Sequence, residues 1–512
     1  METARPQAEE TGQAASTAPH PTTAGLLPTL AAWAGELRYD DIPERLITIA
    51  TSQVLSYMAT ARAALDHPIG AKLVTAFGAP RAAHPEQTAY VLAGLSSCLY
   101  LEDTFYAGHL SHSTVSVPLA YQGVEDADGR TLITAVVAAN ECAARLTAAA
   151  TLGPFRGQSA AHTHLIGAPA ARLRMSGRCD PAVLCNAWGL ALAAPPWSLR
   201  PAFLGSEAKA LSAAVPVRAG LDAAAAARAG LTGLPDLLER PGGFLETFSH
   251  AAIPEAVTHS LGRRWHTETI SFKTHPTAVH LDAPVECASA VHEQLRGTHP
   301  DEIATVDVYA PRLMLEMNRH VAPYMRDGDS PIAALNLSAP YNIATVLLTG
   351  GLEVADVSPP AVHDPRRWTL AKKVRLHYDE KLSRSAMYAT APVGEALRQA
   401  GARALQWMTR IPGEPVEDLV AQIGLPASTF EDATKQIGAR LVVRLTDGRT
   451  LTAERAEGGG SVGSASWTRH PELVREKLHR TGVPQQVVDR LSRLPQLTAG
   501  ELADALRRSW AA

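Results

Sequence analysis

Acids, a hydroxyl and imidazoles gather in one short stretch of the sequence, residues 100–114. Among its side chains are Glu102, Asp103, Thr104, His109 and His112. A carboxylate or imidazole held beside a reacting group can take up or deliver a proton, so this combination suits general acid–base chemistry. The same residue types also cap helices and line solvated loops, which is the alternative interpretation of the stretch.

Three other segments carry basic side chains next to breaks in the helical pattern. His162 and His164 stand just before an expected helix, where imidazoles and free backbone N–H groups together can hold an anion. Lys209 lies among small residues and can enter a cleft to bind a carboxylate. Lys273 and His275 are two residues apart near the end of an expected strand, so on an extended chain they would share one face. Each of these residues could instead be an ordinary surface or capping residue.

A zinc site is a weaker alternative. The spacings His109-x-x-His112 and His162-x-His164 resemble parts of ligand sets, but neither an HExxH motif nor a CxxC pair accompanies them. The sequence has no GxGxxG turn that follows a strand and no Walker-type Gly-Lys-Ser/Thr, and it has no GxSxG elbow that opens a helix after a strand. Gly458–Gly460 are expected to form a plain loop. We therefore expect no metal, and nothing indicates a nucleotide site or a serine-hydrolase site.

The elements that must position these residues are helical in the first half of the chain. Apolar residues recur every three or four positions, as at Leu132, Val136 and Cys142, which is typical of amphipathic or buried helices. Ala-rich segments separated by Gly and Pro predict helices over 46–64, 88–101, 131–150, 161–175, 181–193 and 219–230.

The pattern changes near residue 265. Alternating apolar and polar residues with many Val and Ile predict strands over 268–273, 303–309, 373–378 and 441–445. Helices are expected between them over 281–296 and 341–350, and inserted helices over 383–435. A Gly/Ser loop at 458–466 precedes a helical tail, 471–512. The fold class is therefore mainly α, with a smaller α+β part.

Composition excludes several classes of protein. Of the 512 residues 46% are hydrophobic, and 47 basic residues oppose 51 acidic ones, for a net charge of −4. This balance argues against a nucleic-acid or anionic-membrane binder. Five cysteines without a CxxC pair favour a reducing compartment, and with neither a secretory signal nor a long apolar run we expect a cytoplasmic protein. Residues 1–24 are expected to form a disordered tail.

Taken in order, these segments resemble the MmgE/PrpD family, which includes 2-methylcitrate dehydratase, cis-aconitate decarboxylase and iminodisuccinate epimerase. Leu101-Glu-Asp-Thr-Phe and His112-Ser-Thr-Val-Ser-Val-Pro are similar to the family's Asp-Asp-Thr and His-Pro-Ser…Val-Pro loop. His162 before Gly167-Ala-Pro-Ala-Ala is similar to its second histidine. Lys209 lies eleven residues before a helix glycine, as the family's lysine does.

The rest of the chain continues the resemblance. Leu238-Glu-Arg-Pro-Gly-Gly-Phe is similar to a family loop, and Lys273-Thr-His-Pro is similar to the strand that begins the family's lid domain. Asn336-Leu-Ser-Ala-Pro-Tyr341 is similar to a helix whose tyrosine faces the family's cleft. Tyr100 stands where the family usually has an acid, Ser113 where it has a proline, and His275 where it has an aromatic residue. These differences suggest a modified acid as substrate, in a specialised pathway.

The resemblance implies a helical domain (25–266) completed by C-terminal helices (467–512), and an α+β lid domain (267–455) with the insert at about 383–435. It implies no metal or organic cofactor, a small carboxylic acid as substrate, and a homodimer. The catalytic residues would be His112, Lys209, Tyr341, Asp103 and Thr104. Substrate binding would fall to His162, Lys273, His275, Tyr100, Glu102 and His164, since the counterpart of the family's second histidine can be either His162 or His164.

The leading functional hypothesis is a cofactor-independent lyase that removes water or carbon dioxide from a small di- or tricarboxylic acid. An epimerase or isomerase would share the same carbanion chemistry, so the sequence leaves it as the alternative. The other two alternatives are a non-catalytic relative that keeps the fold and a zinc hydrolase that uses His109 and His112.

Overall fold

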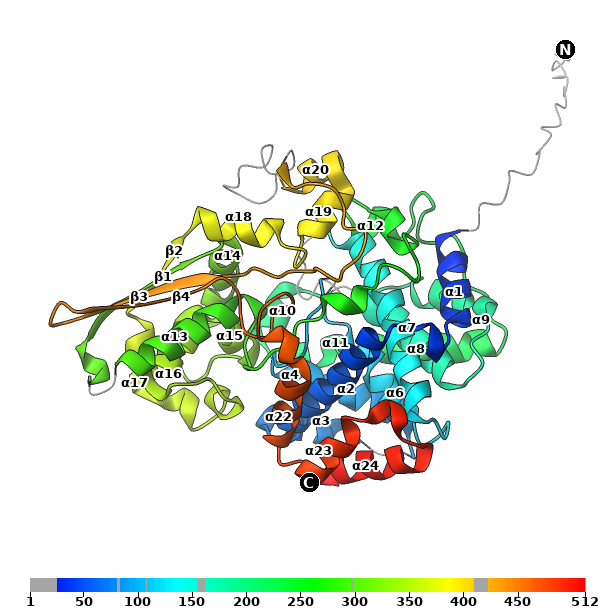
Figure 1. Cartoon of the computed structure of the whole chain (residues 1–512), viewed down its shortest axis with the longest axis horizontal. Helices are drawn as coiled ribbons and strands as arrows, with labels where there is room; N and C mark the ends of the chain where they lie inside the picture. The colour runs from blue at the N-terminus through cyan, green and yellow to red at the C-terminus, as the bar shows by residue number, and fades with distance from the viewer. Residues whose placement is uncertain are drawn as a thin grey trace, which may run out of the picture.

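The computed structural model describes residues 25–80, 83–106, 108–153, 162–196, 198–295, 298–408 and 422–511. The expected N-terminal tail, 1–24, lies outside the described residues. Within them the protein is mainly helical, and one sheet of four strands forms the smaller α+β part, which confirms the expected fold class. Figure 1 shows the sheet projecting from one side of a bundle of helices.

The first half of the chain builds the helical domain, and the end of the chain returns to it (Figure 1). Its main helices are α1 (Leu26–Glu36), α2 (Glu44–Leu65), α3 (Pro68–Phe77), α4 (Pro85–Cys98), α5 (Ser111–Thr114), α6 (Ser116–Tyr121), α7 (Gly129–Ala150), α8 (Thr163–Met175), α9 (Pro181–Ala191), α10 (Arg200–Gly205), α11 (Lys209–Arg228), α12 (Phe244–Phe248), α22 (His470–His479), α23 (Gln485–Leu491) and α24 (Ala499–Ala511). One hydrophobic cluster runs from Leu27 in α1 to Leu506 in α24, so it joins the first and last of these helices.

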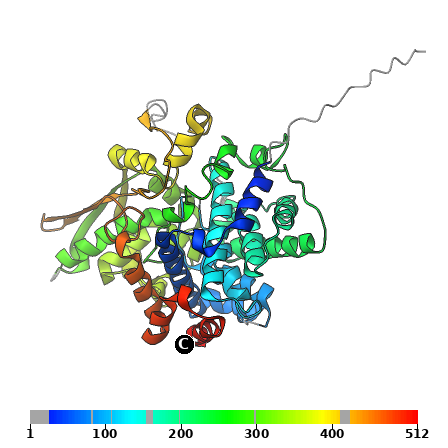
Figure 2. The same ribbon diagram turned by 45° about the vertical axis from the view of Figure 1, so that its right-hand side comes forward.

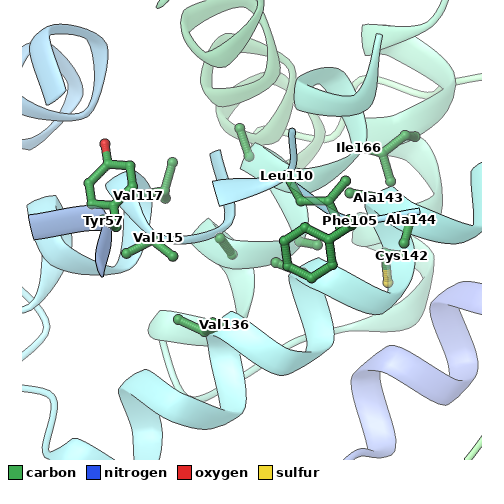
Figure 3. Packing of buried hydrophobic residues seen from close by; sticks show 14 of the residues in the cluster. Tyr57, Phe105, Leu110, Val115, Val117, Val136, Cys142, Ala143, Ala144 and Ile166 are labelled. Carbon is green, nitrogen blue, oxygen red and sulfur yellow. The ribbon is translucent and has the colours of Figure 1, made fainter. Parts of the chain in front are cut away.

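Helix α7 is the central element of this domain. Asp128 caps it by accepting a hydrogen bond from Thr131 N at 2.8 Å, which satisfies one of the free N–H groups of the first turn. Nearly all its residues are buried, as the apolar periodicity predicts. It is long and apolar enough to cross a membrane by length and composition, but the other helices of the core enclose it. Phe105 and Leu110 pack over it near Cys142 (Figure 3).

The sheet belongs to the lid domain, by which we mean the sheet and the helices packed on it. Its strands are β1 (Ile303–Ala310), β2 (Val374–Tyr378), β3 (Ala439–Leu445) and β4 (Thr450–Arg455), in the order β2–β1–β3–β4. Strand β1 is parallel to β2 and antiparallel to β3. Apolar side chains of β1 and β3 join those of α13 (Asp282–Gln294) and α16 (Ala339–Thr349) in a second core cluster. Three expected strands and both expected helices between them are therefore present.

Two expectations about strands need correction. Residues 268–273 form no strand of the sheet: a 3-10 helix, η3 (His266–Thr269), is followed by a single bridge between Ser271 and Thr104. The backbone groups here pair with the 102–112 loop and with Gly460 rather than with a neighbouring strand. In addition, β4 (Thr450–Arg455) pairs with β3, although its burial is too slight to give an apolar pattern in the sequence.

The insert expected at 383–435 contains α18 (Glu380–Tyr388), α19 (Gly394–Ala400) and α20 (Ala404–Met408), while residues 409–421 lie outside the described part. Its apolar residues, among them Leu397, Trp407 and Phe430, belong to the core cluster of the helical domain. A buried ion pair between Glu395 and Arg264 fixes the contact. Figure 2 shows these helices beside those of the helical domain, so the insert bridges the two domains.

Candidate active site

The loop between α4 and α5 runs along the boundary of the two domains. Thr104 and Ser271 exchange two backbone hydrogen bonds, at 3.0 and 2.7 Å, which tie the loop to the segment that leads into the lid domain. On its other side Phe105 and Leu110 are buried against α7 and α8 (Figure 3). Apolar anchors and backbone pairing thus hold the acids and histidines of the loop in fixed positions.

Glu102 is the centre of a buried cluster of charged and titratable side chains. Its Oε1 lies 3.3 Å from Lys209 Nζ, 3.4 Å from His109 Nδ1 and 3.9 Å from His112 Nε2. Its Oε2 lies 3.9 Å from Lys273 Nζ. Glu102 and both lysines are 2% exposed or less. Segments far apart in the sequence therefore meet at one carboxylate that is almost closed to water.

Charge and burial together set the protonation of this cluster. Burial alone would raise the pKa of Glu102, but Lys209 and Lys273 hold that pKa far below its ordinary value. Burial lowers the pKa of His109 and of His112 to about 3, against the opposing effect of Glu102. Near neutral pH the cluster therefore contains an ionised carboxylate and two neutral imidazoles.

Several polar atoms at the centre of the cluster lack a partner. Glu102 Oε2, His109 Nδ1 and His112 Nε2 are buried and have no hydrogen bond within the described part of the chain. Buried polar atoms in proteins are nearly always paired, because leaving one unsatisfied costs about 1–3 kcal/mol. These three atoms converge on one place, which is suited to the polar groups of a bound small molecule.

Tyr100 shapes the cluster through its backbone and its ring. Its φ is +54°, a left-handed conformation that a residue with a Cβ adopts at a cost of about 1–2 kcal/mol. The Tyr100 carbonyl accepts a hydrogen bond from Lys273 Nζ, and its ring lies 3.9 Å from Lys209 Nζ. At a position where the resemblance implies an acid, Tyr100 instead makes a cation–π contact with Lys209. This contact stabilises the ammonium group without adding a negative charge.

A hydrogen-bond chain orients His112 and fixes its tautomer. Ser96 Oγ donates to Ala93 O at 3.1 Å and lies 2.8 Å from His112 Nδ1. Because the serine hydroxyl has a single proton, we assign Nδ1 as the donor to Ser96. This assignment leaves a lone pair on Nε2, the nitrogen that faces Glu102.

The two histidines before α8 are placed differently. His164 Nδ1 lies 3.0 Å from Ser113 Oγ, and its ring centre is 5.5 Å from that of His112. The His162 ring instead packs against Phe244, at 5.1 Å between centroids, and burial lowers its pKa to about 4. The geometry thus places His164, rather than His162, beside the cluster.

Two other predicted site residues lie apart from the cluster in their described contacts. His275 Nδ1 lies 3.3 Å from Leu352 O, and the backbone at His275 forms a bend rather than the extended strand on which it would share a face with Lys273. A substrate-binding role for His275 stays a prediction. The Tyr341 hydroxyl donates to Asp356 O at 2.5 Å, and its ring packs on Trp368. A catalytic role for Tyr341 stays a prediction.

Asp103 connects the cluster to a pocket. Its Oδ1 accepts a hydrogen bond from Ser56 at 2.6 Å, and Ser56 accepts one from Lys477 Nζ at 2.8 Å. Burial raises the pKa of Asp103, and Lys477 opposes this rise. Lys477 and Leu101 also line a pocket of about 450 Å³ between α2, α22 and residues 353–358. A chain of polar groups thus leads from this pocket to the buried loop.

Three side chains offer ligand atoms at a spacing that fits a metal ion. The ligand atoms of Glu102, His109 and His112 all lie within 4.8 Å of one another. However, Lys209 and Lys273 contact the same carboxylate, so a dication bound there would be repelled by two ammonium groups at close range. The set is therefore better suited to acid–base chemistry than to metal binding.

The low pKa values of His109 and His112 predict a loss of stability in mild acid. The unfolded chain binds protons at His109 and His112 near pH 6.5, whereas in the folded protein their pKa is about 3. As the pH falls from 6.5 to 3, the unfolded state binds more protons, so each imidazole lowers the free energy of unfolding by about 1.4 kcal/mol per pH unit. Urea midpoints at pH 7.5, 6.0 and 5.0 should fall steadily, and less steeply in His112→Asn. An equal slope in the variant would contradict this.

Sequence reasoning missed several residues that complete the site. Ser96, Ser56 and Lys477 are joined to the predicted residues by hydrogen bonds, and Lys435 Nζ donates to Thr104 Oγ1. None of them lies in a motif. Lys435 is 331 positions from its partner and Lys477 is 421 from Ser56, so only the folded chain reveals them.

Comparisons with known proteins cover most of the chain. Residues 28–256 match the MmgE/PrpD N-terminal domain, and residues 275–413 match the MmgE/PrpD C-terminal domain. A curated relative, the cis-aconitate decarboxylase-like protein oryM of Aspergillus oryzae (strain ATCC 42149 / RIB 40), is 25% identical over 258 residues. This alignment covers 48% of the present chain and 50% of the relative, so the chain matches about half the length of that protein.

Proposed function

Since the chain belongs to the MmgE/PrpD family, we propose that it is a lyase that removes carbon dioxide or water from a small polycarboxylic acid. The family and the decarboxylase-like relative support a lyase-type enzyme. The observation that carries the finer proposal is the meeting of Lys209, Lys273 and the neutral His112 at one buried carboxylate.

The two lysines provide the electrostatic part of the mechanism. The ammonium groups of Lys209 and Lys273 stand on either side of Glu102, so a substrate carboxylate that enters the cluster meets positive charge. Loss of carbon dioxide and loss of water both build negative charge on the carbon next to that carboxylate. Fixed ammonium groups in a site that excludes water stabilise such charge strongly, because they need no reorganisation during the reaction.

His112 provides the proton transfer. Its Nε2 carries the lone pair and points toward the centre of the cluster, so it can accept the proton of a C–H bond and return it. In dehydration His112 takes the C–H proton, the C–H electrons form the double bond, and the hydroxyl group leaves as water with the proton that His112 returns. In decarboxylation the C–C electrons remain on carbon when carbon dioxide leaves, and that carbon takes up one proton, which His112 relays from water because its Nε2 is unprotonated beforehand.

Proton NMR in heavy water tests this proposal. Wild-type protein is incubated with citrate-like, aconitate-like and substituted succinate acids, and we expect deuterium at an α-carbon or a new alkene signal with at least one of them. His112→Asn should slow this reaction about 100-fold, because general acid–base catalysis contributes about 10²–10⁴. His84→Asn, a change at an exposed histidine, is the control.

The products also separate the alternatives. Exchange with inversion and without loss of a group would make the protein an epimerase or isomerase. If the wild-type protein neither consumes nor exchanges any of the acids, the proposed activity is wrong.

A further inference from the structure

Lys477 is a buried lysine of α22 whose ammonium group reaches the loop that carries Glu102. It is 8% exposed. Its Nζ donates hydrogen bonds of 2.8 Å to Ser56 Oγ on α2 and to the carbonyl oxygen of Leu101. Lys477 and Leu101 are 376 positions apart in the chain. A helix near the C-terminus therefore holds the active-site loop through one ammonium group.

These two hydrogen bonds restrain both neighbours of Glu102. Leu101 precedes Glu102, and Lys477 holds its carbonyl oxygen directly. Asp103 follows Glu102, and its Oδ1 accepts a hydrogen bond of 2.6 Å from Ser56, the same hydroxyl that accepts one from Lys477. The directions of these bonds agree, because the ammonium donates to Ser56 and Ser56 in turn donates to Asp103. Lys477 therefore fixes the backbone before Glu102 and the side chain after it.

Glu102 needs this support because it lies in a loop. The backbone at residues 101–103 forms neither helix nor strand. The Glu102 carboxylate must nevertheless stay 3.3 Å from Lys209 Nζ and 3.9 Å from Lys273 Nζ. Hydrogen bonds from an ionised donor are about twice as strong as neutral ones, so an ammonium group is suited to this task. A displacement of about 1 Å in a catalytic arrangement can lower the rate about 100-fold.

Lys477 also borders a pocket through which its ammonium group could be replaced. Together with Leu101, Thr274 and Arg480 it lines the pocket of about 450 Å³. A pocket of this size can admit a small organic molecule. A shorter side chain at position 477 should leave a gap that opens onto this pocket. A small amine can then enter the gap and take the place of the missing group.

We propose that Lys477 is a positioning residue for the reaction, which holds Glu102 in the place where Lys209 and Lys273 meet it. This inference rests on the proposed function and adds to it a residue of the C-terminal helices on which the reaction depends. Lys477 acts through the two neighbours of Glu102 and not on the substrate.

Steady-state kinetics of Lys477→Ala test this role, with the acid that the wild-type protein consumes in the heavy-water assay. We expect kcat to fall about 100-fold and KM to stay within about threefold, because the groups that bind the substrate remain while their alignment is lost. Arg480→Ala is the matched control, since Arg480 lines the same pocket but pairs with the exposed Glu476, and its kcat should stay within about twofold of wild type.

Ser56→Ala provides a second variant that removes only the link between Lys477 and Asp103. It should lower kcat about tenfold, the effect of losing one hydrogen bond in the transition state. If Lys477→Ala does not fold, this variant decides, and an unchanged kcat in Ser56→Ala would then contradict the inference.

Rescue with a small amine separates positioning by the ammonium group from simple packing. Propylamine matches the atoms from Cγ to Nζ that Lys477→Ala removes, and it is protonated near neutral pH as lysine is. It should raise the kcat of Lys477→Ala about tenfold, because hydrogen bonds to Leu101 O and Ser56 Oγ can form again. The neutral 1-propanol fills the same space and should have no effect, and neither compound should change the wild type or Arg480→Ala.

The outcomes separate this inference from the proposed function. If the wild-type protein is active and Lys477→Ala keeps its kcat, the inference is wrong. A rise in KM with unchanged kcat would make Lys477 a substrate-binding residue, which also overturns it. If propylamine and 1-propanol restore kcat equally, or if neither does, Lys477 is only a packing residue. If the wild-type protein consumes none of the acids, the proposed function fails, and the role of Lys477 fails with it.

Discussion

Lys209→Met lowers kcat/KM for the proposed reaction by about 10³-fold, the largest effect on activity that we expect from a single substitution. Lys209 is 1% exposed, and its Nζ lies 3.3 Å from Glu102 Oε1 and over the Tyr100 ring. Methionine is unbranched like lysine and one heavy atom shorter, so it fills most of the same space without the charge. Loss of one preorganised group that stabilises developing negative charge costs about 10²–10³ in rate, and weaker substrate binding adds to it.

The NMR assay in heavy water measures this loss directly. Lys72→Met makes the same exchange at a lysine whose side chain is 64% exposed and paired with Glu207, so its activity should match wild type. A Lys209→Met protein that is folded, by circular dichroism, and still keeps a tenth of the activity would show that Lys209 has no electrostatic role in the reaction.

Glu102→Gln gives the largest effect that we expect on stability, a decrease of about 3–5 kcal/mol in the free energy of unfolding near pH 7. The substitution keeps the shape of the side chain but leaves the buried ammonium groups of Lys209 and Lys273 without their shared counter-ion. Removing one partner from a buried ion pair costs this much, because the remaining charge is neither hydrated nor neutralised. The pKa of Glu102 lies below that of an unfolded glutamate, so its contribution is complete at neutral pH and is lost only in strong acid.

Guanidinium unfolding of the two proteins measures this difference. Glu472→Gln, at an exposed ion pair with Arg469, should change stability by less than about 1 kcal/mol and serves as the control. Glutarate should stabilise Glu102→Gln more than wild type, because a bound carboxylate replaces the missing charge between the lysines. A Glu102→Gln protein as stable as the control would show that the lysines need no counter-ion.

Local patterns in the sequence were enough to predict most of the fold. The three- and four-residue spacing through Leu132, Val136 and Cys142 corresponds to the buried helix α7, and the alternation over 303–309 corresponds to β1. The prediction of a strand over residues 268–273 was wrong. These residues are buried at the boundary between the two domains, and Ser271 forms a single bridge with Thr104 instead of pairing in a sheet. The weakly buried β4 carried too little pattern to be predicted.

The candidate site was predictable only where its residues lie in family motifs. Glu102, His112, Lys209 and Lys273 meet as the resemblance implies, although their separations in the chain exceed one hundred residues in several pairs. His109 lies outside the motifs that carry the resemblance, so only the structure places it 3.4 Å from Glu102. Lys435 could not be found, because a lysine in a segment of mixed composition has the same sequence pattern whether it faces solvent or a buried hydroxyl.

The last helices of the chain have a consequence for how the protein is made. Helix α22 packs against α2, and Lys477 reaches Ser56 across 421 positions of sequence. While a ribosome is still synthesising the chain, α2 is present without the surface that covers it, and Asp103 lacks the ammonium that faces it. Contacts between distant segments form slowly because a long loop must close first. The nascent protein therefore has an unfinished core until α22 has left the ribosome, and the loop that carries Asp103 is among the last regions to reach its final surroundings.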